Sequence, residues 1–166
     1  MPKILVFAPC EKVIVSEQDN TSSLMSLIEG FTLDVPEGVE LPEGTAIPIK
    51  WHIFSLWEKV EGDEGRNFEQ RVTLVLPTGK QVLDMPSTLD FKPHLKRFRM
   101  TIMVVNFPLS PAGTCLLNLS VREVGQENWQ EVAEYGIFIT RPERAREGTA
   151  ANEETRPETG EAGEVG

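Results

Sequence analysis

Cysteine and histidine are scarce in this chain of 166 residues, which contains two of each. The two cysteines, Cys10 and Cys115, are too few for a disulfide framework and lie in apolar, strand-like segments, where a free thiol packs as a small hydrophobic group. We therefore expect the protein in a reducing cytoplasm. Two histidines also leave little material for acid–base chemistry near neutral pH.

Long apolar runs and a net positive charge are missing as well. No run approaches the roughly twenty apolar residues of a membrane-spanning helix, and residues 4–8 fall short of the roughly seven to fifteen of a secretory signal. The formal net charge of −10 repels nucleic-acid phosphates and anionic lipids. We therefore expect a protein that is not exported by that route, does not attach to membranes and does not bind nucleic acid.

The chain contains one cluster of basic residues despite its acidic composition. We interpret it as a solvated loop followed by the outward face of a strand, because nucleic-acid binders usually carry a net basic domain. A phosphate or nucleic-acid site is the alternative interpretation. The cluster consists of Lys92, His94, Lys96, Arg97 and Arg99.

Sequence motifs of catalysis are absent: there is no glycine-rich phosphate loop and no GxSxG, HExxH or CxxC. Cys115 with His94 could form a nucleophile–base pair, but nothing in the sequence orients them. Those two residues with Cys10 and His52 could supply four zinc ligands, but their spacing matches no zinc pattern. We predict no catalytic residues, no metal ligands and no cofactor, and we assign the two cysteines to core packing.

Loop carboxylates offer a calcium alternative. Residues 37–43 together with Asp63, Glu64, Asp84 and Asp90 could place oxygen ligands at one end of the molecule. We favour the simpler interpretation that they keep an acidic protein soluble.

The three tryptophans, Trp51, Trp57 and Trp129, could form a platform for stacking sugars. Trp51 and Trp57, however, share one face of a predicted strand with Ile53. That pattern favours a place in the core.

The most legible pattern covers residues 98–140, where three strand-like segments are separated by two polar, turn-forming breaks. Leu117, Leu119 and Val121 alternate with polar residues, which is the period of a strand with one buried face. We interpret the three segments as a β-meander that closes the fold. The last of them should carry Trp129, Glu131, Ala133, Tyr135, Ile137 and Ile139 on one side.

The rest of the chain also reads as strands. Residues 46–60 form the most apolar one, with two partly apolar faces that predict cover on both sides. We favour a strand over a short helix for residues 22–30. Shorter predicted strands lie at residues 4–7 and 12–16, interrupted by Pro9, and at 68–76 and 81–83, with a loop at 86–93.

About eight or nine strands and no convincing long helix predict an all-β fold, an antiparallel β-sandwich of the Ig-like or C2-like kind. We assign this domain to residues 1–141, with its first half at residues 3–83. Residues 142–166 have no large aliphatic or aromatic side chain except Val165, so we predict a disordered acidic tail. A solubilising role for that tail is favoured over recruitment of a partner.

The order of these features resembles an uncharacterised bacterial β-sandwich family of unknown function. The resemblance rests on Cys10-Glu11-Lys12-Val13, Ser26-Leu27-Ile28-Glu29-Gly30-Phe31, the acidic proline-containing loop, Ile47-Pro48-Ile49-Lys50-Trp51-His52-Ile53-Phe54, and the glycine-led strand at residues 113–121. It implies a β-sandwich in a bacterial cytoplasm and no particular chemistry.

Taken together, these patterns predict a non-enzymatic interaction module that binds an unidentified protein partner through an edge strand or through loops. A small-ligand or carbohydrate-binding domain, and an enzyme that uses loop carboxylates and a histidine, are the alternatives. A homo-oligomer through edge strands also stays open. The candidate surfaces are the outward residues Asn118, Ser120 and Arg122 and the loops at residues 108–113, 36–44 and 62–67.

Overall fold

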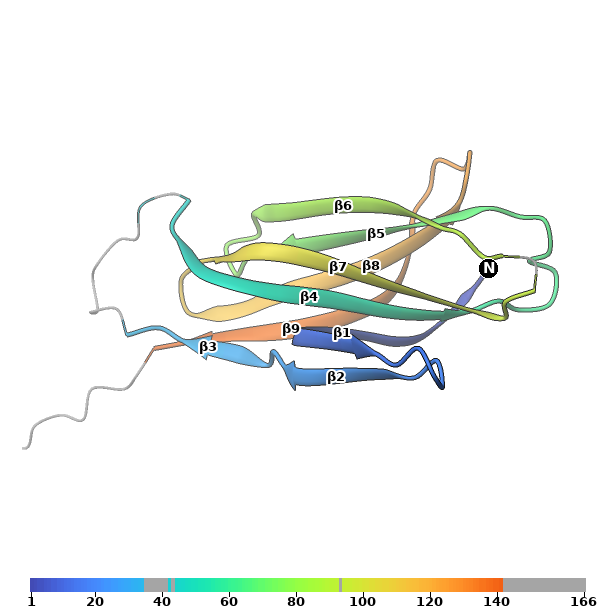
Figure 1. Cartoon of the computed structure of the whole chain (residues 1–166). Helices are drawn as coiled ribbons and strands as arrows, with labels where there is room; N and C mark the ends of the chain where they lie inside the picture. The colour runs from blue at the N-terminus through green and yellow to red at the C-terminus, as the bar shows by residue number, and fades with distance from the viewer. Residues whose placement is uncertain (35–41, 43, 93, 142–166) are drawn as a thin grey trace, which may run out of the picture.

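The computed structural model describes residues 1–34, 42, 44–92 and 94–141. This part of the chain contains nine β-strands and no helix, which confirms the predicted all-β class (Figure 1). The predicted tail lies outside the described residues. The strands are β1 (Lys3–Val15), β2 (Ser22–Leu27), β3 (Gly30–Thr32), β4 (Ala46–Glu58), β5 (Phe68–Val75), β6 (Gln81–Leu89), β7 (Arg97–Pro108), β8 (Gly113–Glu123) and β9 (Gln130–Thr140).

The strands form two sheets that pack face to face. Sheet A has the order β2-β1-β4-β7 and sheet B the order β3-β9-β8-β5-β6. All neighbouring strands are antiparallel except β3 and β9, which are parallel. In immunoglobulin terms, β4 and β7 occupy the places of strands B and E, and β5, β6, β8 and β9 those of C, C′, F and G. The Ig-like form of the predicted sandwich is therefore the one observed.

The core lies between the two sheets, and it is formed by strands in which buried and more exposed side chains alternate. Along β5, every second residue from Phe68 to Leu74 is buried, and along β8 the same holds from Cys115 to Val121. Trp51 and Trp57 of β4 fill the facing side with no exposed surface, as their spacing predicts. Fully buried side chains of this size are each worth about 1.5–3 kcal/mol relative to exposure.

β4 is also covered on its second face. Phe54 lies between the inward-facing Ile53 and Ser55, so its side chain points away from sheet B, yet only 2% of it is exposed. Ala8 and Cys10, on the neighbouring strand, are buried on the same outer side and do not belong to the core between the sheets. The prediction of a strand covered on both sides is confirmed.

The predicted meander at residues 98–140 is wrong in its first strand. β8 and β9 form a hairpin in sheet B, but β7 pairs with β4 in sheet A. The short turn at residues 109–112 therefore crosses from one sheet to the other. Each sheet mixes early and late strands, so residues 3–83 are not one half of the sandwich. Alternation reports that a strand has a buried face, but not which sheet it joins.

Two prolines mislead sequence reading. β1 continues through Pro9, whose carbonyl accepts the Ile28 N–H at 3.0 Å on the side of β2. In an antiparallel strand, the N–H and C=O of one residue point to the same side, so an N–H at position 9 would point toward β2 and not toward β4. Residue pairing with β2 begins only at Cys10. Proline at position 9 therefore costs no hydrogen bond to β4. β6 likewise continues through Pro86, which is tolerated because β6 is an edge strand. The predicted loop at residues 86–93 therefore begins only after Leu89.

In two further places, at β2 and at β9, the structure differs in part from the predicted strands. Residues 22–27 form a strand, as favoured over a helix, but the chain leaves β2 at Ile28 and enters the other sheet as β3. In β9 a register shift lies opposite Leu119 and Ser120, so Val132 packs against the core while Glu131 is exposed. The predicted one-sided series in β9 therefore holds only from Ala133 onward.

Candidate functional site

The outer edge of β7 is the first candidate surface, because β7 is the last strand of sheet A. In the immunoglobulin order A-B-E-D, a further strand lies at this edge. Here the described residues between β6 and β7, 90–92 and 94–96, form no strand, and no other described strand occupies that place. Of the inward-facing residues of β7, Ile102 is buried, but Phe98, Met100 and Val104 are only half buried, whereas Val72 and Leu74 in the middle of sheet B are closed off from solvent.

The outward side of β7 is apolar toward its C-terminal end. Met103 is 59% exposed and Val105 is 56% exposed. At the N-terminal end the outward residues are Arg97 and Arg99. β7 thus combines unpaired backbone groups, an apolar half and a basic half.

The other three edges carry features that discourage strand addition. β3 has three residues, and β2 has six and contains Ser26 with a left-handed φ of 53°. β6 carries Pro86 and the outward ion pair between Arg71 and Asp84, whose Nε–Oδ1 distance is 2.7 Å. Among the described strands, β7 is the longest edge, and its own irregular residues, Asn106 with a left-handed φ of 67° and Pro108, lie at its C-terminal end.

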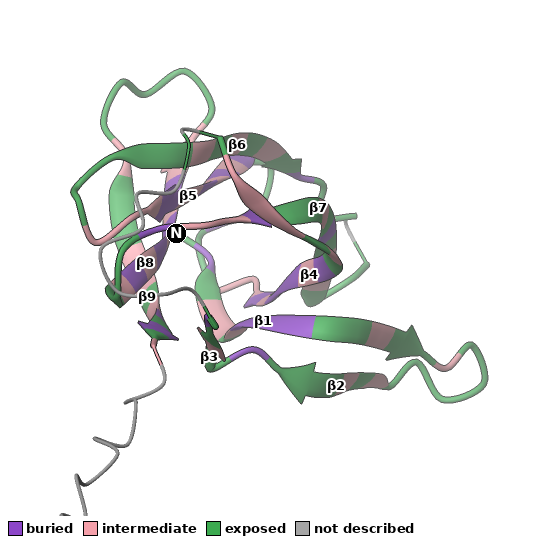
Figure 2. Cartoon of the chain, turned by 90° about the vertical axis from the view of Figure 1, so that its left-hand side faces the viewer, coloured by how far each residue is buried: buried purple, intermediate pink, exposed green. Residues whose placement is uncertain are grey.

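The second candidate surface, which we call the hairpin groove, lies on the outer face of sheet A beside the β1–β2 hairpin. Figure 2 shows this hairpin extending away from the layered part of the molecule. The groove encloses about 630 Å³ and has a mainly apolar lining. It is lined by Val6, Asn20, Thr21, Ser22, Leu24, Phe54, Leu56, Leu95, Arg97, Phe98 and Arg99.

Arg99 connects the groove to the tip of the hairpin. Its Nη1 donates to the carbonyl oxygen of Asn20 and to Oγ of Ser22, both at 3.0 Å, and its Nη2 donates to Oδ1 of Asn20. Asn20 has a left-handed φ of 58°, a conformation that asparagine tolerates in tight turns. All three acceptors are neutral, so the positive charge of Arg99 has no carboxylate partner among the described residues.

The basic cluster predicted from sequence is therefore split by the fold. Arg99 lies half-buried in the groove and the exposed Arg97 also lines it, whereas Lys96 lies outside it; Lys96 and Arg97 approach Glu58 at 4.0 and 3.7 Å. His94 and Lys92 lie exposed in the loop before β7. Sequence reasoning missed the groove itself. The sequence features that could have indicated the groove are the apolar outward positions of β4 and the basic cluster before and within β7.

Both cysteines, the candidate nucleophile Cys115 and the candidate zinc ligand Cys10, are buried. Desolvation raises the pKa of the Cys10 thiol above its ordinary value, and a hydrogen bond from the Lys12 backbone opposes this only partly. Desolvation also raises the pKa of Cys115, whose Sγ lies 3.7 Å from the Ser110 hydroxyl. Cys10 pairs in register with His52, while Cys115 lies in the other sheet. Within the described ranges, no three histidine, cysteine or acidic side chains come together as a metal site.

The tryptophans do not form an open platform. Trp51 and Trp57 are fully buried, as predicted. The ring of Trp129 is covered by the guanidinium of Arg122, which lies 4.3 Å from the ring centroid, and Arg71 lies 5.8 Å away. The outward residue Arg122 also donates to Glu69 at 2.7 Å, so it is engaged in sheet B.

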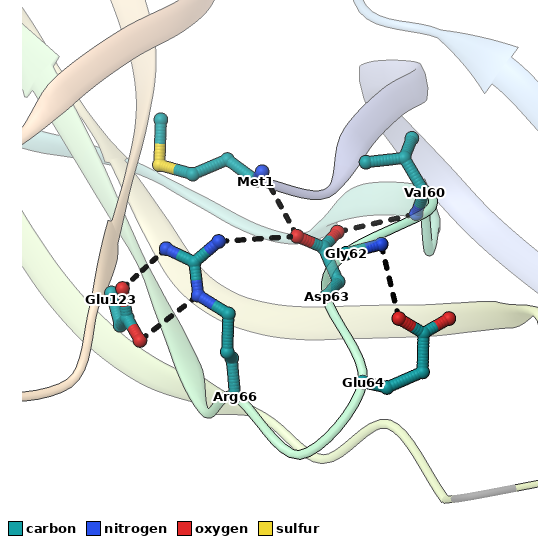
Figure 3. A network of polar contacts seen from close by, with 7 residues as sticks. All are labelled: Met1, Val60, Gly62, Asp63, Glu64, Arg66 and Glu123. Atoms are coloured by element: carbon teal, nitrogen blue, oxygen red, sulfur yellow. Dashed lines mark hydrogen bonds and ion pairs between the residues drawn. The ribbon is translucent and has the colours of Figure 1, made fainter.

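Asp63 departs most from its predicted role as an exposed loop carboxylate. It is 1% exposed, and Figure 3 shows its two oxygens turned toward the α-amino group of Met1 and the backbone N–H of Val60. These distances are 2.9 and 3.2 Å. Arg66, at 3.8 Å, joins Asp63 to Glu123 of β8. Asp63 therefore fastens the loop at residues 62–67 to the N-terminal strand and to sheet B.

The remaining predicted surfaces give no assembled site. In the loop at residues 108–113, Ser110 is buried and its hydroxyl contacts the carbonyl of Pro111. The loop at residues 36–44 lies almost wholly outside the described residues.

Comparison of the chain with protein-family models and with curated proteins finds no match. None of the described residues forms a helix long and apolar enough to cross a membrane.

Proposed function

We propose that this chain is a non-enzymatic protein-binding module that accepts an extended segment of a partner protein along the free edge of β7. The observation that carries the proposal is the missing strand next to β7, which leaves a twelve-residue edge without a neighbour. Addition of a strand at such an edge satisfies its unpaired backbone groups, and side-chain pockets then supply selectivity.

The half-buried residues of β7 specify the chemistry of the partner segment. A strand added at this edge would turn every second side chain toward the inward face of β7, where Met100 and Val104 are half buried and Phe98 already contacts Phe91, so those partner positions should be apolar. The alternate positions would lie beside Met103 and Val105 at one end and Arg97 at the other. We infer a segment of about five to eight residues with alternating apolar residues and an acidic residue at the Arg97 end.

A bacterial cytoplasm is the proposed setting, as the sequence resemblance implies. The two cysteines are buried, free thiols, which agrees with a compartment that keeps thiols reduced. A second copy of the chain is the competing occupant of the edge. We favour a different protein, because two copies would bring two net charges of −10 together.

Site-specific photo-crosslinking tests this proposal in the host cell. A photoreactive residue replaces Met103 on β7 or, as matched control, Val82 on the β6 edge, which is 37% exposed. We expect one adduct of defined mass at position 103 and none at position 82. Adding Val105→Lys should abolish the adduct, whereas adding Val82→Lys should not, because a lysine at an edge opposes strand pairing.

Three outcomes would contradict the proposal. Equal crosslinking at positions 82 and 103, or none at either, would remove β7 as the binding edge. An adduct with twice the mass of the chain would show that a second copy, and not a different protein, occupies the edge.

A further inference from the structure

We propose that the hairpin groove binds a small amphiphile, an apolar chain that ends in a carboxylate, with the carboxylate on Arg99. The groove shares Arg97 and Phe98 with β7, but this proposal does not rest on strand addition there. It rests on the apolar lining of the groove and on the state of one arginine.

The size and lining of the groove fit a small ligand. A volume of about 630 Å³ lies within the roughly 300–1,000 Å³ of small-molecule sites, which are mainly apolar with a few placed polar groups. Phe54 and Leu56 of β4 form one side with Val6 of β1, and Leu24 and Leu95 come from the hairpin and the loop before β7. With Phe98 of β7, the apolar part of the lining consists of four aliphatic side chains and two phenylalanines. An alkyl chain suits this lining better than a sugar, which needs an exposed aromatic face and several polar partners.

The charge of Arg99 indicates that the polar end of the ligand is an anion. Other arginines on the strand faces and loops meet carboxylates: Arg66 meets Glu123, Arg71 meets Asp84 and Arg122 meets Glu69. Arg99 is held only by neutral oxygens of the hairpin tip. In a protein of net charge −10, a half-buried cation without a counter-charge is complementary to an anion brought by a ligand.

The geometry of Arg99 favours a carboxylate. A guanidinium has five N–H donors, and three of them are used toward Asn20 and Ser22. The two remaining donors have no partner among the described residues, and a carboxylate can accept two such bonds at once. Because the hairpin already fixes the guanidinium, little side-chain entropy is lost when the anion binds.

Titration with decanoate, below its micelle concentration, tests the site. Methyl NMR shifts should report saturable binding of one decanoate per chain, with the largest shifts at Val6, Leu24 and Leu56. Decanol, which has the same chain without the charge, should bind more weakly. Arg99→Gln should weaken decanoate binding about tenfold, as expected for loss of a charge-assisted contact, and weaken decanol binding much less.

Two further variants separate charge from hairpin structure. Lys96→Gln is the matched control, because the Lys96 side chain is 79% exposed and does not line the groove, and it should change the decanoate Kd less than about twofold. Ser22→Ala removes one hairpin contact of Arg99 but keeps the charge, so decanoate should still bind better than decanol.

The proposal fails if decanoate gives no saturable shifts, or if Arg99→Gln affects decanoate and decanol equally. Shifts centred on the exposed Met103 and Val105 methyls would mean nonspecific adsorption and would also overturn it. Tighter binding of decyl phosphate than of decanoate would refute the carboxylate assignment.

Discussion

At the scale of single residues, a buried amide joins the two sheets. Gln70 of β5 is fully buried, and its Oε1 accepts hydrogen bonds from Nε1 of Trp57 at 2.8 Å and from Oγ of Ser55 at 2.9 Å. Its Nε2 lies 3.0 Å from Sδ of Met100. Three strands of both sheets therefore meet at one polar side chain inside an apolar core, where unmade hydrogen bonds are costly.

Replacing Gln70 by leucine keeps the volume roughly constant but removes the acceptor of two buried donors. We expect the free energy of unfolding to fall by about 1–3 kcal/mol. Urea denaturation of the Gln70→Leu variant measures this, with the exposed Gln81→Leu as control. Equal stability of both variants would show that the buried network contributes nothing.

The two buried thiols give a second residue-scale prediction. Because burial raises the pKa of Cys10 and of Cys115, neither should form a thiolate readily at pH 8 in the folded protein. A thiol reagent should label both only after addition of denaturant. Rapid labelling of either cysteine under native conditions would mean that its strand opens far below the global free energy of unfolding.

At the scale of elements, the β1–β2 hairpin is tied to sheet A through Arg99. Removing the side chain in Arg99→Ala should loosen residues 16–22 without melting the core, since the lost contacts are at the exposed tip. We expect hydrogen exchange of the hairpin amides to accelerate while the melting temperature shifts by only a few degrees. Unchanged exchange at residues 16–22 would show that the hairpin holds its place without this contact.

Sequence patterns located the elements well and their partners poorly. Alternation at Leu117, Leu119 and Val121 was sufficient to predict β8, because a half-buried strand repeats with period two. The same signal could not place β7 in sheet A, because pairing is a long-range property that local periodicity does not encode. The prolines at positions 9 and 86 misled for a related reason: their cost depends on which neighbour the N–H would have faced.

The candidate surfaces were only partly visible in the sequence. The apolar outward residues of β4 and the basic cluster around Arg99 lie far apart in the sequence, and only the folded hairpin brings them into one groove. An unoccupied strand position is invisible in a sequence, since it is a property of sheet order.

At the scale of the whole molecule, surface carboxylates set the response to acid. Hydrogen bonding from Arg66 lowers the pKa of Glu123, and hydrogen bonding from Arg71 lowers that of Asp84. A carboxyl group with a lowered folded-state pKa stabilises the fold above its unfolded pKa, which is about 4, and this contribution disappears as the pH falls through the folded-state value.

The melting temperature should therefore be nearly constant from pH 7 to about pH 5 and fall below about pH 4. Calorimetry at several pH values measures this. In Arg71→Gln, the pKa of Asp84 should return toward its ordinary value, so the drop in acid should be smaller than in the parent chain. An identical acid response in both proteins would rule out this ion pair as a contributor.

The central claim is that the open edge of β7 is where a partner protein binds. Hydrogen–deuterium exchange of the complex, compared with the free chain, tests it most directly, because strand addition gives new hydrogen bonds to backbone amides of the edge. We predict slower exchange within residues 97–108 on binding and no change within residues 81–89 of β6. Protection confined to loops, or absent from residues 97–108, would contradict the account.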